Sequence, residues 1–229
     1  MLQRDTKMSI RTYLKNKKQT HFTIGDIEVF VKNEIENENV SVKSVINLVV
    51  RKIPKHLLRN VDSIYVGQFS FLNSKNYEAA YENSSIFVTN VQDNEQDMAD
   101  DIIHEIAHSI EEIYSRYLYS DQTLANEFKR KRKQLHQILM NKGYDIQKQV
   151  FMNLDYDQKL DEFLYSTVGY QALTTLSSTI FHSPYASTSL NEYFADGFEA
   201  FYMNDDIPKL KRISPELYKK LTGLLEEEE

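Results

Sequence analysis

The chain has 229 residues, enough for one compact domain and too few for two large ones. Its hydrophobic share of 41% and charged share of 27% are those of a globular protein and argue against wholesale disorder. The absence of cysteine excludes disulfides, thiolate nucleophiles and cysteine-bound zinc, so any metal must be held by histidine and carboxylate side chains. The formal charge of -7 disfavours a general nucleic-acid binder.

No apolar run approaches the roughly 20 residues that span a bilayer. Residues 1–20 are polar and basic, without the apolar segment of a signal peptide, and we expect them to be loosely attached. Residues 226–229 are all glutamate, which is typical of a solvated tail. We therefore expect a cytoplasmic protein without a membrane partner, with non-classical export or delivery by a larger particle as the alternatives.

The first half of the chain carries both helix and strand patterns. Helices are predicted over residues 26–36 and 41–51, the second of them capped by Ser41. Residues 61–68 predict a strand that is buried on both faces, and residues 85–89 predict a second strand. This second strand either pairs with an extended peptide at a sheet edge or is buried.

The strongest helical pattern covers residues 94–119, where apolar side chains recur along one stripe. Asp93 and Gln96 are the predicted capping box of this helix. Three further helices are predicted, at residues 121–141, at 189–203 and from Pro215 onwards. Strands that come early and helices that come late indicate an α+β fold, mostly helical with a small early sheet.

One motif in the long helix carries the chemistry, His104-Glu105-Ile106-Ala107-His108. Histidines four apart project from one helix face, so both imidazoles can reach one ion at about 2.0–2.1 Å. Glu105 lies beside such an ion and can take a proton from the water that it holds. Composition alone would give this pattern in on the order of one chain in a hundred, and a chance copy rarely falls inside a long amphipathic helix.

A catalytic zinc usually has three protein ligands and one open position. Glu192 is the expected third ligand, and Asp196, four residues later, is expected to accept a hydrogen bond from a ligand histidine and so orient it. The alternative for Glu192 is a capping box with Ser189, and the alternative for Asp196 is a surface carboxylate. Glu199 lies on roughly the same face as Glu192 and is the reserve ligand.

The two histidines of the motif, followed by Glu192 and Asp196, resemble the gluzincin zinc metallopeptidases. The segment from Glu192 to Phe198 is most similar to the family of the anthrax lethal factor catalytic domain and the proline–proline endopeptidases. The resemblance covers roughly residues 95–120 and 183–222. It implies a zincin-like domain over residues 41–229. Residues 1–40, where the resemblance is absent, are expected to be an N-terminal extension that is helical in part.

The resemblance also implies a role for Tyr185, which stands seven residues before Glu192, where the family has a tyrosine that stabilises the transition state. A phenol can donate a hydrogen bond to an oxyanion, although a packed or surface tyrosine is the alternative. The interval between His108 and Tyr185 is longer than in the family, so a helical insertion is expected at about residues 121–182. Asp196 departs from the family, which more typically has glutamate there.

These observations predict a zinc-dependent endopeptidase with one Zn²⁺ per chain and a peptide or protein substrate. Glu105 and Tyr185 are the expected catalytic residues. The alternative function is a catalytically inactive binding or assembly protein with the same fold. The basic run at residues 129–133 is interpreted as a solvated helix face, because five consecutive residues spread around a helix and do not form one anion-binding patch.

Overall fold

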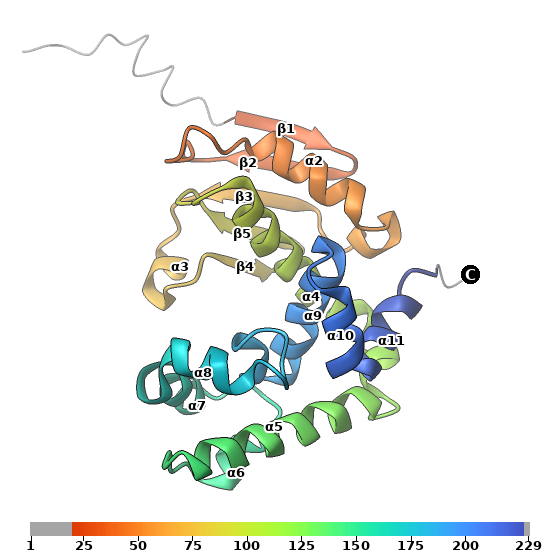
Figure 1. The fold of residues 1–229 in the computed structure, drawn as a ribbon. Coiled ribbons are helices and arrows are strands. Elements are labelled where there is room, and N and C mark those ends of the chain that lie inside the picture. The colour runs from red at the N-terminus through yellow and green to blue at the C-terminus, as the bar shows by residue number, and fades with distance from the viewer. Residues whose placement is uncertain (1–19, 227–229) are drawn as a thin grey trace, which may run out of the picture.

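The computed structural model describes residues 20–226, which form a mixed sheet followed by a mostly helical region, the predicted α+β arrangement (Figure 1). The predictions for residues 1–19 and 227–229 lie outside the described residues. The strands are β1 (Thr20–Ile24), β2 (Ile27–Val31), β3 (Ser63–Gly67), β4 (Ala79–Glu82) and β5 (Ser85–Thr89). The longer helices are α2 (Val42–Lys52), α4 (Glu95–Tyr119), α5 (Thr123–Asn141), α8 (Tyr170–Ser177), α9 (Leu190–Met203), α10 (Ile207–Ile213) and α11 (Pro215–Gly223). The shorter elements are η1 (Lys55–Leu58), α3 (Ser70–Lys75), α6 (Lys148–Phe151), α7 (Gln158–Glu162), the π-helical η2 (Phe163–Gly169) and η3 (Tyr185–Ser187).

The sheet has the strand order β1-β2-β3-β5-β4, with antiparallel pairs at both edges and parallel pairs inside. Val29, Ile64 and Ile86 are aligned across the three inner strands and are completely buried. Because β5 lies between β3 and β4, the buried alternative for residues 85–89 is correct and the edge alternative is wrong. The edge strand on this side of the sheet is β4.

The helix predicted over residues 26–36 is wrong, because this segment contains β2. Gly25 has a φ of 62° and begins the two-residue turn that joins β1 to β2, a conformation that glycine adopts without strain. Ile27 and Val29 are buried on either side of the exposed Glu28, which is the period of a strand. Residues 20–31 therefore contribute two strands to the sheet, within the segment expected to be an N-terminal extension.

The N-cap of the motif-bearing helix α4 lies one residue later than predicted. Asn94 is the N-cap, and its side chain accepts hydrogen bonds from the backbone N–H groups of Gln96 and Asp97, so the box predicted with Asp93 is wrong. By contrast, Ser41 caps α2 as predicted, with its hydroxyl oxygen 3.3 Å from the backbone nitrogen of Ser44. Helix α4 packs against α2, against strands β4 and β5, and against α9.

The region expected as an insertion, residues 121–182, is helical wherever it has regular structure. Its first helix, α5, packs on α4, α9 and α11, and its buried side chains join the same hydrophobic cluster as those of the sheet. Within residues 20–226, every helix is too short or too polar to cross a bilayer.

The basic run at residues 129–133 is only partly solvated. Lys131 and Arg132 are buried, and the Arg132 guanidinium donates hydrogen bonds to backbone oxygens that include those of Ser187 and Thr188. The prediction of a wholly solvated face is wrong for these two residues, because α5 is covered on this side by the segment that leads into α9.

Candidate metal centre

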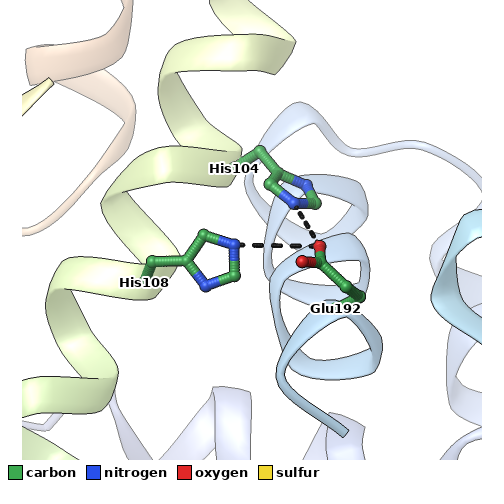
Figure 2. Close-up of side chains that lie close together, drawn as sticks. All are labelled: His104, His108 and Glu192. Atoms are coloured by element: carbon green, nitrogen blue, oxygen red, sulfur yellow. Dashed lines mark hydrogen bonds and ion pairs between the residues drawn. The ribbon is translucent and has the colours of Figure 1, made fainter. Parts of the chain in front are cut away.

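Two helices that are distant in the sequence bring together three side chains that could hold a metal ion (Figure 2). His104 and His108 project from one face of α4 and Glu192 projects from the first turn of α9, which packs beside it. Oε2 of Glu192 lies 2.9 Å from Nε2 of His104 and 3.7 Å from Nε2 of His108. One ligand atom from each of the three residues falls within 4.8 Å of the others.

This spacing suits a single metal ion. Ligand atoms at about 2.0–2.2 Å from a tetrahedral ion stand roughly 3.3 Å from one another, and the two measured separations fall on either side of that value. Two imidazoles and one carboxylate make a donor set with a fourth position left for water or substrate, as in a catalytic rather than a structural site. All three side chains line a cleft.

The capping alternative for Glu192 holds for its backbone and not for its carboxylate. The Ser189 side chain is the N-cap of α9 and accepts a hydrogen bond of 3.1 Å from the backbone N–H of Glu192. The Glu192 carboxylate is turned to the histidines. Because Ser189 caps the helix through the backbone of Glu192, the Glu192 carboxylate is available as a ligand.

The contact expected of Asp196 is made by Glu199 instead. Nδ1–H of His104 donates to Oε2 of Glu199 at 3.1 Å, while Asp196 is buried beside Ser183 and His182. Four and seven residues are close to one and two helical turns, so Asp196 and Glu199 both lie roughly on the Glu192 face of α9, and the spacing alone does not choose between them. The position of Glu199 on this face was visible in the sequence, but its expected role was that of a reserve ligand.

A second orienting carboxylate, Glu111, was not predicted. It lies three residues after His108 on α4, and its Oε2 accepts a hydrogen bond of 3.0 Å from Nδ1–H of His108. The only signal for this contact in the sequence is the spacing of His108 and Glu111, since residues three apart are neighbours on a helix surface. Both ligand histidines thus have a carboxylate on the ring nitrogen that faces away from Glu192.

The His104 ring lies between two carboxylates and is held in its charged form. Burial by itself lowers the pKa of His104, but the hydrogen bonds and charges of Glu192 and Glu199 outweigh it and raise this pKa well above its ordinary value. For Glu192, burial raises the pKa, and the bonds and charges of the two histidines reverse this, so that its pKa is lowered. A metal ion must therefore displace a proton from His104 in order to bind.

Glu105 is buried next to the ligands and also lines the cleft. Burial raises its pKa, and the charges of His108 and His104 act in the opposite direction without cancelling that effect. A carboxylate with a raised pKa would be suited to taking up a proton from a water held by an ion at this site.

Tyr185 lies in η3, and its ring centre is 6.0 Å from that of His104. Burial, followed by the charge of Glu192, raises the pKa of Tyr185. The phenol therefore keeps its proton at neutral pH and remains a hydrogen-bond donor, while 36% of the residue is exposed.

The cleft has a volume of about 900 Å³ and extends from the edge strand β4 to the helical region. Ala79, Ala80 and Tyr81 form its wall on β4, and Leu164 and Tyr170 face them from η2 and α8. Its lining is acidic, because several carboxylates besides Glu192 line it and Lys75 is the single lysine among the lining residues. These carboxylates are Glu78, Asp100, Asp101, Glu105, Asp161, Glu162 and Glu199.

Comparisons with protein-family models, with curated proteins and with solved structures found no match to this chain. The fold and the site define an α+β protein in which two histidines and one glutamate could hold a metal ion.

Proposed function

We propose that this chain is a zinc-dependent endopeptidase of the gluzincin type, with His104, His108 and Glu192 as the metal ligands. The observation that carries the proposal is the short distance between the Glu192 carboxylate and both imidazoles, across two helices that are far apart in sequence. Zinc in such a donor set polarises a carbonyl group and lowers the pKa of a bound water.

Glu105 and Tyr185 have the chemistry that peptide hydrolysis requires. Glu105 takes a proton from the attacking water and returns it to the leaving amine, for which its raised pKa is suited. Tyr185, kept protonated, donates a hydrogen bond to the oxyanion of the tetrahedral intermediate. A purely structural metal site needs neither group, which favours the enzyme over the alternative of an inactive binding or assembly protein.

The cleft supports a peptide as the substrate. Strand β4 pairs only with β5 among the described residues, so its outer edge can pair with an extended chain, apart from the Tyr81 backbone N–H, which is hydrogen-bonded to Glu105. This edge lies along the same cleft as the metal-binding residues. The acidic lining of the cleft favours substrate segments that carry lysine or arginine. This preference should weaken as salt is added.

The test is metal analysis together with cleavage of a peptide library by the purified chain, with and without a chelator. We expect one zinc per chain, cleavage that stops on chelation and returns with zinc, and products enriched in basic residues. Glu105→Gln should keep its zinc and lose cleavage by at least about 100-fold. A chain that binds no zinc, or a Glu105→Gln variant as active as the wild type, would refute the proposal, and zinc without any cleavage would favour the inactive alternative.

A further inference from the structure

The Glu111 carboxylate joins the two helices that carry the metal ligands. Oε2 accepts a hydrogen bond from Nδ1–H of His108, and Oε1 accepts one of 3.0 Å from the side-chain amide of Asn191 and another from the Tyr119 hydroxyl. His108 and Tyr119 belong to α4, whereas Asn191 belongs to α9 and immediately precedes Glu192.

Burial of the Glu111 carboxylate lowers the stability of the fold, which calls for a functional reason. Only 8% of Glu111 is exposed, and no lysine or arginine between residues 20 and 226 forms an ion pair with it. Burying a carboxylate costs free energy that its hydrogen bonds offset only in part. An apolar residue at this position would pack α4 against α9 at lower cost, so the retained charge points to the histidine that it contacts.

We propose that Glu111 is a positioning residue, which holds His108 as a metal ligand and, through Asn191, sets the distance between His108 and Glu192. A carboxylate can only accept hydrogen bonds, so its contact with Nδ1 requires the proton to be on that nitrogen. Nε2 of His108 is then the nitrogen available to a metal, and it is the one that faces Glu192.

Tyr119 and Asn191 keep the carboxylate from rotating away from the ring. Their two donors occupy one carboxylate oxygen and leave the other for His108. Glu199, the corresponding partner of His104, is more exposed, with a side-chain exposure of 32% against 9% for Glu111. We therefore expect the geometry of His108 to depend on Glu111 more strongly than the geometry of His104 depends on Glu199.

The proposal rests on the metal site of the proposed function and not on the cleavage reaction, so it is tested by metal binding. Glu111→Gln keeps the shape of the side chain but places an amide N–H₂ where only acceptors fit. We expect the dissociation constant for Zn²⁺, measured by competition with a chromogenic chelator, to rise about 10- to 100-fold. The visible spectrum of the Co²⁺-loaded variant should also change, because the ligand field reports the orientation of His108.

Tyr119→Phe is the milder variant, should Glu111→Gln fold poorly. It leaves the carboxylate in place and removes one donor, so we expect a smaller rise in the Zn²⁺ dissociation constant in the same direction. The matched control is Glu127→Gln on α5. Glu127 is also a buried carboxylate bonded to a tyrosine, Tyr193, and to backbone N–H groups of α11, but it contacts no metal ligand.

We expect Glu127→Gln to lower the thermal midpoint while leaving the Zn²⁺ affinity and the Co²⁺ spectrum unchanged. Zn²⁺ affinity in Glu111→Gln and Tyr119→Phe equal to that of the control would overturn the positioning role while leaving the proposed function intact. Failure of the wild-type chain itself to bind Zn²⁺ would overturn both.

Discussion

At the scale of single residues, the site depends on carboxylates of the same chemical type with different tasks. Glu192 faces both imidazoles, while Glu199 and Glu111 each hold the far nitrogen of one ring. Asp196 contacts neither ring and is buried beside His182 and Ser183. Substitutions that remove a charge and keep the shape can separate these tasks.

Glu199→Gln and Asp196→Asn should therefore differ in their effects on Zn²⁺ binding and on stability. We expect Glu199→Gln to weaken Zn²⁺ binding by about 10-fold, because Nδ1 of His104 loses a charged partner. Burial raises the pKa of Asp196 to about 6, so the wild-type carboxylate costs stability above that pH. Asp196→Asn should leave Zn²⁺ binding unchanged and raise the thermal midpoint at pH 8. Chelator competition and thermal unfolding measure the two effects, and the reverse result would restore the role first expected of Asp196.

Tyr185→Phe tests the oxyanion donor. The variant keeps the ring and loses the hydroxyl, so we expect zinc content close to that of the wild type and a fall in kcat of roughly 10²- to 10³-fold, with a smaller change in KM. Steady-state kinetics on a cleaved library peptide, with zinc content measured on the same sample, would check this. An unchanged kcat would mean that the tyrosine is only a wall of the cleft.

At the scale of secondary-structure elements, α5 fixes the segment from which α9 starts. The Arg132 guanidinium on α5 is 1% exposed and is bonded to the backbone oxygens of Phe151, Asn153, Ser187 and Thr188. These last two carbonyls lie between Tyr185 and Glu192, so one buried side chain fixes the backbone segment that joins these two residues.

Arg132→Met should destabilise the fold strongly. It removes the donors for several buried carbonyls, and each unsatisfied group costs about 1–3 kcal/mol, so we expect a loss of at least about 3 kcal/mol in the free energy of unfolding. The matched control is Arg130→Met, two residues away on the same helix and exposed, with an expected change within about 0.5 kcal/mol. Urea unfolding of the two variants measures the difference, and equal stabilities would show that the Arg132 bonds contribute nothing net.

At the scale of the whole molecule, half-buried acids make stability depend on pH. Burial, with the charges of neighbouring carboxylates, raises the pKa of Asp100 to about 7. Burial likewise raises the pKa of Asp101 to about 6, against a weaker lowering by its hydrogen bond from Gln92. The pKa of His104 is raised as well, by Glu192 and Glu199 against the effect of burial. All three groups hold their protons more tightly in the folded chain than in the unfolded one.

Such groups stabilise the fold at low pH, and this stability is lost as the pH rises through their folded pKa values. We therefore expect the thermal midpoint of chelator-treated protein to fall between pH 5 and pH 8, by about 2–4 °C for each kcal/mol lost. Zinc binding should have the opposite dependence, since the ion competes with the proton on His104, and the Zn²⁺ affinity should rise with pH over this range. Calorimetry with and without Zn²⁺ would check both slopes, and a metal-free midpoint that rises with pH would contradict the assignment.

Local patterns in the sequence were sufficient for most helices and for the two-histidine motif. Four residues are one helical turn, so the shared face of His104 and His108 follows once residues 94–119 are helical. The same holds for α2, α5, α9 and α11, whose apolar periodicity and capping or proline signals are contained within each helix. The choice of Glu192 rested on the need for a third metal ligand and was supported by a family resemblance, because nothing local joins Glu192 to α4.

The tertiary structure alone decided the rest, because those features depend on residues that are distant in the chain. The strand at residues 27–31 exists because β3 and β1 pair with it, and that pairing overrides a weak helical pattern. The burial of Arg132 depends on the segment that packs across α5, and the choice of Glu199 and Glu111 over Asp196 depends on how α4 and α9 meet. Helical spacing determines which residues share a face, but only packing determines what that face meets.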